Sequence, residues 1–186
     1  MKRPVRTLFA LVSVGGKIST GADDTFDVDS GYPRIAGLRE GLYQYYEIEQ
    51  TTGLWSLNTG RTQSRLGVNE KAFTQKTGVN FVVLDNSHLT EHGVRYFCSL
   101  SREFVLVKQN TSHPGFKVKE DNLHIGVQET SKLSWALNVL YQKYGCERIT
   151  VQTGGTVNGI LLREKLLDYV DIVVALCLLG TVMSQL

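Results

Sequence analysis

The feature that most constrains the fold is an alternation of short apolar runs with segments of helical periodicity. Seven runs rich in β-branched and aromatic residues are strand-like, namely 7–14, 54–58, 80–85, 103–109, 122–127, 148–152 and 171–176. Apolar residues recur at helical spacing in 34–50, 88–100, 131–144 and 156–168. Several strand-like runs are apolar throughout, which is typical of strands covered on both faces. This order predicts an α/β fold in three layers, a mostly parallel twisted sheet with helices on both faces.

Length and composition narrow the class of protein. The 186 residues, of which 42% are hydrophobic, suit one domain over residues 1–186 with a sizeable core. The 20 Lys and Arg nearly balance the 18 Asp and Glu, and without a long basic run no nucleic-acid partner is expected. The three cysteines are widely spaced and form no C-x-x-C pair. They therefore predict neither a disulfide framework nor a thiolate metal cluster, and they favour a cytoplasmic setting.

Neither apolar end of the chain predicts a membrane segment. MKRPVRTLFALVSVGG begins with basic residues as a secretory signal would, but its apolar run is short and no small-x-small cleavage site follows. We therefore expect a buried first strand there. VDIVVALCLLGTVM contains an aspartate and is shorter than the roughly 20 residues that span a bilayer. No membrane partner is expected.

Two adjacent glycines stand where a strand-like run gives way to a helical pattern, in VQTGGTVNGILL (151–162). Free N–H groups at the positive end of a helix dipole bind phosphate, and glycine lets the backbone come close to it. Neither the G-x-G-x-x-G fingerprint nor the P-loop spacing is present. Gly154 and Gly155 therefore predict either a phosphate site or a tight turn without a ligand.

A second junction of this kind lies in SLNTGRTQSRLG (56–67). Gly60 follows a strand-like run, and Arg61 and Arg65 flank the start of a short helix. The planar fork of arginine suits phosphate, although a solvated arginine pair is an equally good interpretation. Two junctions at the carboxyl ends of one parallel sheet favour a dinucleotide, whose phosphates could each meet a helix start.

HLTEH (88–92) matches H-x-x-E-H, a zinc-hydrolase pattern that places His88 and His92 one helical turn apart. A third ligand would have to come from elsewhere; Glu103 and Glu120 are available, but no spacing selects either. Three fixed positions occur often by chance, so a solvated helix start is favoured and no metal is expected. For His113 and His124, which have no evident partner, surface or satisfied core roles are expected.

Three stretches together resemble the dihydrofolate-reductase-like superfamily: ALVSVGGKIS, NTGRT and VQTGGTVNGILLREKLLDYVDIVVA. The closer resemblance is to the reductase domain of riboflavin biosynthesis, the C-terminal domain of the bifunctional deaminase-reductases. Its members read roughly S-x-D-G-K-I-A near the start and G-G-x-x-L-N-x-x-L-L near the end. With one residue fewer between the glycines and the asparagine, the matching residues of the second motif are Gly154, Gly155, Asn158, Leu161 and Leu162. The resemblance covers most of residues 5–176, the middle only by strand and helix order.

The resemblance implies an NADPH-dependent reductase whose substrate is a ribosylaminopyrimidine phosphate, with hydride reducing the ribose to ribityl. It implies that the cofactor pyrophosphate is held by Gly154, Gly155, Thr156 and Asn158, and another cofactor phosphate by Gly60, Arg61 and Thr62. The candidates on the substrate side are Ser13, Lys17, Arg34 and Arg39. No residue is assigned as general acid. We further expect a cytoplasmic enzyme that forms a homodimer.

Two departures from the family keep other functions open. Gly15 stands where the family has the Asp of S-x-D-G-K, and a contact to substrate would be lost with it. Relatives continue through a Gly-rich turn into closing strands, whereas this chain reads LCLLGTVMSQL, so the closing C-terminal strands are expected to be missing. The alternative is a catalytically silent nucleotide-binding or assembly module of the same fold. A zinc hydrolase using HLTEH is a distant third.

Overall fold

The computed structural model describes residues 2–18, 31–41, 44, 47, 48, 51, 53–127 and 132–177. The chain divides into two compact units. The first unit comprises Met1–Leu8 and Thr52–Tyr169, and the second comprises Phe9–Thr51 and Val170–Leu186. The single domain expected from the sequence stays a prediction.

Seven strands form one sheet in the order β5-β4-β3-β2-β6-β1-β7. Their bounds are β1 Val5–Ser13, β2 Trp55–Thr59, β3 Asn80–Leu84, β4 Phe104–Lys108, β5 Leu123–Val127, β6 Arg148–Val151 and β7 Tyr169–Ala175. The ladders that join β5, β4, β3, β2, β6 and β1 are all parallel. Each strand-like run of the sequence overlaps one of these strands, so the predicted α/β fold with its parallel sheet is confirmed.

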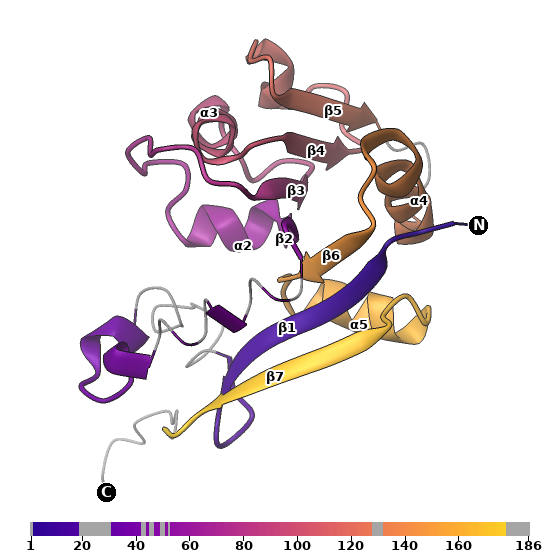
Figure 1. The fold of residues 1–186 in the computed structure, drawn as a ribbon. Helices are drawn as coiled ribbons and strands as arrows, with labels where there is room; N and C mark the ends of the chain where they lie inside the picture. Colours follow the sequence, from indigo (N-terminus) through magenta and orange to yellow (C-terminus); the bar gives the residue numbers. More distant parts are fainter. Residues whose placement is uncertain are drawn as a thin grey trace, which may run out of the picture. The chain divides into compact units, whose positions relative to one another are not determined.

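Helices cover both faces of the sheet in the first unit (Figure 1). They are α2 Gly60–Arg65, α3 Glu91–Leu100, α4 Leu133–Tyr144 and α5 Gly155–Arg163. On one face Val82 of β3 belongs to the same buried cluster as Leu137 of α4 and Leu161 of α5. On the other face the next residue, Val83, belongs to the cluster of α3 that contains Phe97. Successive residues of one strand point to opposite faces, so a strand between two helical layers is apolar throughout.

Three predicted helices have different bounds. Residues 88–90 precede α3 because Thr90 is its N-cap, with Oγ1 accepting the N–H of Gly93 at 3.2 Å. The segment predicted as 156–168 ends at Arg163, where the N–H of Leu166 closes a Schellman-type bond of 2.7 Å to the carbonyl of Leu161. The predicted helix 34–50 begins with the 3-10 turns η1 Tyr32–Arg34 and η2 Arg39–Gly41. Among the described residues of 42–52, helix is seen at 44, 47, 48 and 51. By contrast, α4 ends as predicted at Gly145, whose φ is 65°.

The second unit is built on the later half of β1. Phe9 and Leu11 form a small buried cluster with Tyr32 of η1, against which Val173 of β7 packs. After β1 the chain turns at Gly16, whose φ of 72° favours glycine. Residues 19–30, and residues 178–186 of the C-terminal stretch, lie outside the described part of the chain. Within that part, no helix is both long enough and apolar enough to cross a membrane.

Candidate functional site

The start of α5 presents bare backbone. Gly154 is the N-cap residue, and no side chain of the described chain caps the helix. Neither Gly154, with φ −74°, nor Gly155 has a positive φ, so a left-handed turn does not account for the glycine pair. A Cβ on Gly155 would meet no described atom within 4 Å, and Gly155 and Thr156 are exposed. The surface in front of the helix start is therefore open to a ligand.

The first intrahelical hydrogen bond of α5 fixes which N–H groups of its first turn are free. The N–H of Asn158 donates to the carbonyl of Gly154 at 3.1 Å, so the N–H at 158 is not free. The N–H groups of residues 155 to 157 precede this first intrahelical donor and are the orphan donors of the helix. The side chain of Asn158 accepts the hydroxyl of Thr153 at 2.5 Å. Asn158 thus fixes the turn that leads into the helix.

The start of α2 is capped. Thr59 Oγ1 accepts the N–H of Thr62 at 3.4 Å, and the two hydroxyl oxygens lie 2.9 Å apart. Gly60 is buried, and a Cβ there would lie 2.2 Å from Cγ of Asp85. The physical reason for glycine at 60 is therefore the close packing of a neighbouring side chain. Arg61 is exposed.

The fold brings these two junctions together. β2 and β6 are neighbours, with Leu57 opposite Val151, so α2 and α5 begin at the same edge of the sheet. A Cβ on Gly154 would lie 3.5 Å from Thr62 Oγ1, which is ordinary van der Waals contact. Thr62 and Gly154, which the resemblance assigned to two different cofactor phosphates, thus lie next to each other.

A chain of polar side chains supports this surface and was missed from the sequence. Asn58 donates to Ser56 Oγ at 2.9 Å, Ser56 donates to Gln152 at 2.6 Å, and Gln63 donates to Asn58 at 2.9 Å. These bonds tie β2 and α2 to the segment between β6 and α5. The available signal was the polar residues at alternate positions of LWSLN, which break the apolar pattern of the other strands.

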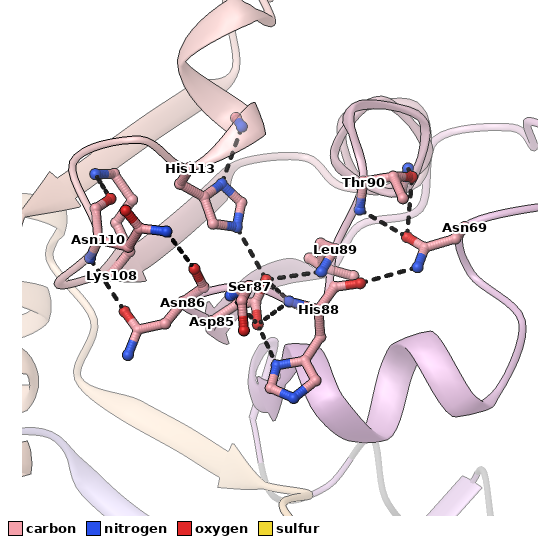
Figure 2. A network of polar contacts seen from close by, with 12 residues as sticks. Asn69, Asp85, Asn86, Ser87, His88, Leu89, Thr90, Lys108, Asn110 and His113 are labelled. Carbon is pink, nitrogen blue, oxygen red and sulfur yellow. Dashed lines mark hydrogen bonds and ion pairs between the residues drawn. The ribbon is translucent and has the colours of Figure 1, made fainter.

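A second network, also missed, surrounds Asp85 at the end of β3 (Figure 2). The Asp85 side chain is fully buried and accepts His113 Nε2 and His88 Nδ1, each at 2.9 Å. It also accepts backbone N–H groups, the shortest from Leu89 at 2.8 Å. Burial alone raises the pKa of Asp85, but the hydrogen bonds from His113, from the backbone of Leu89 and His88 and from the His88 ring lower it overall. Asp85 is therefore a buried carboxylate.

The loop after β4 is joined to the same network (Figure 2). Asn86 Oδ1 accepts the N–H of Gln109 at 2.7 Å, and Asn110 Nδ2 donates to the carbonyl of Asn86 at 2.9 Å. Lys108 is buried, donates to the carbonyl of Asn110 and lies over the ring of Phe116, 3.7 Å from its centre. These contacts fix the carboxyl-end loops of β3 and β4 against each other.

HLTEH does not form the geometry of a zinc site. His88 lies in the turn before α3, so the expected spacing of one helical turn is wrong, and its Nδ1 is bound to Asp85. His92 Nε2 contacts the carbonyl of Lys71 at 2.9 Å, and its ring stacks on Phe73. The two candidate third ligands have other partners, since Glu103 pairs with His124 and Glu120 with Arg95. Among the described residues no group of three or more His, Cys, Asp or Glu could hold a metal ion.

The four candidates for the substrate side all lie in the second unit. Ser13 is buried, and its Oγ accepts the N–H of Lys17 at 3.2 Å, so these two share one turn. Arg34 and Arg39 are exposed on η1 and η2. The cofactor candidates all belong to the first unit. At Gly15 an added Cβ would be 3.8 Å from Ser13 Oγ, an ordinary contact, so the backbone there accepts a side chain at its Cβ.

Comparison with solved structures shows the same fold in proteins of riboflavin biosynthesis. The chain is similar to a deaminase and 5-amino-6-(5-phosphoribosylamino)uracil reductase of Thermotoga maritima, with 13% identity and a TM-score of 0.64 over 96% of this chain and 46% of the other. Riboflavin biosynthesis reductase Rib7 of Saccharomyces cerevisiae gives 14% identity and a TM-score of 0.59 over 96% of this chain and 76% of Rib7. RibD of Acinetobacter baumannii gives 14% identity and a TM-score of 0.66 over 96% and 48%.

The chain thus spans about half the length of two of these three proteins. No curated protein sequence matches it. The model of the family described as RibD C-terminal domain matches residues 6–185, which confirms the resemblance seen in the sequence. The chain belongs to the RibD C-terminal domain family.

Proposed function

We propose that this chain is an NADPH-dependent reductase that converts a ribosylaminopyrimidine phosphate to its ribityl form. The observation that carries the proposal is the uncapped start of α5 with open space before Gly155, in a chain of this family. Two of the similar structures are those of a 5-amino-6-(5-phosphoribosylamino)uracil reductase and a riboflavin biosynthesis reductase. The nicotinamide cofactor would supply the hydride.

The residues of the helix start fit a pyrophosphate. Three orphan N–H groups and the positive end of the α5 dipole favour an anion, and the missing Cβ at 155 leaves room for its oxygens. Thr156 is exposed in the same first turn and offers a hydroxyl. Thr62 extends the surface, and Arg61 adds a cation that can form two hydrogen bonds to one phosphate. Asn158 acts on the cofactor indirectly, because its side chain is bound to Thr153.

These residues would bind and orient; none of them is placed to move a proton. Ser13, Lys17, Arg34 and Arg39 are proposed to hold the substrate, with the arginines suited to its phosphate. Rate enhancement would come from holding the acceptor carbon against the nicotinamide, because correct orientation removes most of the entropy cost of the reaction. We leave the general acid unassigned.

The direct test is turnover. Purified protein is mixed with NADPH and the ribosylaminopyrimidine phosphate, and the loss of NADPH absorbance is followed together with mass spectrometry of the product. Product heavier by two hydrogens, formed in step with NADPH loss, supports the proposal. Gly155→Val, which fills the space in front of the helix, should abolish the reaction.

Gly15 supports a second candidate, a silent nucleotide-binding module of the same fold, because the family has an aspartate at this position. The two candidates differ in one measurement. A silent module binds NADPH, detected by its fluorescence or by calorimetry, but transfers no hydride to any ribosylated pyrimidine. A homodimer is also proposed, and sedimentation of the purified protein tests it.

A further inference from the structure

The buried carboxylate of Asp85 has two histidine partners, and only one of them can carry a positive charge. His113 Nδ1 accepts the N–H of Gly115 at 2.9 Å, so its proton is on Nε2, which donates to Asp85 at 2.9 Å. This pair of bonds fixes His113 as the neutral tautomer. Within the described part of the chain the other ion partner of Asp85 is His88. Neutralisation of Asp85 therefore depends on the protonation of His88.

His88 is held with one nitrogen inward and the other free. Its Nδ1 lies 2.9 Å from Asp85 Oδ1, and its backbone N–H donates to the same carboxylate at 3.0 Å. The side chain is 43% exposed, whereas that of Asp85 is 0% exposed. Figure 2 shows the rings of His88 and His113 on opposite sides of the carboxylate. No hydrogen bond or ion pair joins Nε2 of His88 to another described residue, and the side chain is partly exposed, so this nitrogen can bind a ligand.

The position of this histidine is next to the proposed cofactor surface. β3 pairs with β2, with Leu84 opposite Thr59, and Asp85 packs directly against Gly60 at the start of α2. The start of α5 lies two strands away, about 10 Å at the usual strand spacing. The charged residues of α2 are Arg61 and Arg65, which stay cationic at every pH of interest. On α3, Glu91 pairs with Arg95.

We propose that His88, oriented by Asp85, is a proton-carrying contact for a phosphomonoester of a bound ligand. A phosphomonoester dianion at Nε2 stabilises the imidazolium form, which Asp85 stabilises from the other side. Binding then takes up one proton from solvent, which forms the Nε2–H bond of His88, and no other covalent bond changes. The inference rests on the proposed function, which offers two ligands with this group: the 2′-phosphate of NADPH and the ribose phosphate of the substrate.

The test compares the wild type and two variants with three ligands. Dissociation constants for NADP⁺, NAD⁺ and ribose 5-phosphate are measured by calorimetry between about pH 6 and 8, the range in which histidine titrates. His88→Gln removes the titrating group at an exposed position and leaves Asp85 a hydrogen-bond donor. His92→Gln is the matched control, since His92 is the second residue of α3 and its ring contacts the carbonyl of Lys71 and not Asp85. Calorimetry in two buffers of different ionisation enthalpy gives the protons taken up on binding.

Between about pH 6 and 8, the dissociation constant of the recognised ligand should rise with pH in the wild type and in His92→Gln. This rise should be about tenfold larger than the rise in His88→Gln. Proton uptake should be smaller in His88→Gln. A steep NADP⁺ profile beside a flat NAD⁺ profile identifies the 2′-phosphate, and a steep profile for ribose 5-phosphate identifies the substrate phosphate. Equal profiles and equal proton uptake in wild type and His88→Gln, for every ligand, overturn the inference. Failure of both nicotinamide nucleotides to bind wild type refutes the proposed function instead, and the ribose 5-phosphate arm still decides the role of His88.

Discussion

Replacement of Gly155 by alanine separates a binding role from a structural one. The structure predicts that the folded state accepts the methyl group, because Gly155 has no positive φ and a Cβ there meets nothing within 4 Å. Alanine also restricts the unfolded chain, which stabilises a protein by about 0.4–1 kcal/mol at a compatible position. For a chain of this size the melting temperature should rise by about 1–4 °C.

Cofactor affinity should change in the opposite direction. The methyl group would occupy the surface where a pyrophosphate contacts the orphan N–H groups of residues 155 to 157. We expect the dissociation constant of NADPH to increase at least about tenfold, or about 1.4 kcal/mol. Calorimetric titration and a thermal melt on the same sample give both quantities.

Two other glycines serve as controls. Gly159→Ala lies one turn later in α5, where a Cβ meets only the flexible end of Arg163 at 3.3 Å, so affinity should stay at the wild-type value. Gly60→Ala places a Cβ 2.2 Å from the buried Asp85 side chain, and overpacking of this kind costs about 1–3 kcal/mol of stability. If Gly155→Ala is destabilised while its folded fraction binds NADPH normally, the phosphate interpretation of the helix start is refuted.

Three further perturbations test other parts of the site. Arg61→Ala should weaken NADPH by about 1.5–3 kcal/mol and leave NADH unchanged, because a charge-assisted phosphate contact is lost; equal weakening of both nucleotides in calorimetry would contradict a 2′-phosphate contact by this side chain. Asp85→Asn should lower the free energy of unfolding by about 3 kcal/mol in urea titrations, since charged hydrogen bonds are lost in a buried site. Because the pKa of Asp85 is lowered in the folded state from its ordinary 3.8, its stabilisation is present above that pH and is lost as the pH falls below it, so only the wild type should show this extra acid sensitivity. Gly15→Asp restores the family residue at a position where a Cβ makes only an ordinary contact. An increase in turnover, with an unchanged melting temperature, would show that the wild type is limited by the missing carboxylate. Unchanged turnover would indicate that this position does not act on the substrate.

The sequence by itself determined the layers of this protein. In strand-like runs such as NFVVLD the successive residues Val82 and Val83 are both apolar because they face opposite helical layers. The apolar composition of such a run therefore predicts that both faces of the strand are buried. The helix start at Gly155 could be placed from the sequence too, because a strand, two glycines and a helical pattern follow one another without a gap. Both kinds of signal depend on residues that are neighbours in the chain.

Tertiary structure decided which residues meet. Gly60 was predicted as a phosphate residue, but its lack of a side chain is required by Asp85, which comes from the neighbouring strand. His113, for which the sequence offers no partner, is buried against Asp85 although 28 positions separate them. Likewise, His88 lies before α3, since Thr90 caps the helix and Asp85 binds the turn. Contacts of this kind depend on strand order and on the close approach of loops at one edge of the sheet, and neither is encoded in the spacing of residues along the chain.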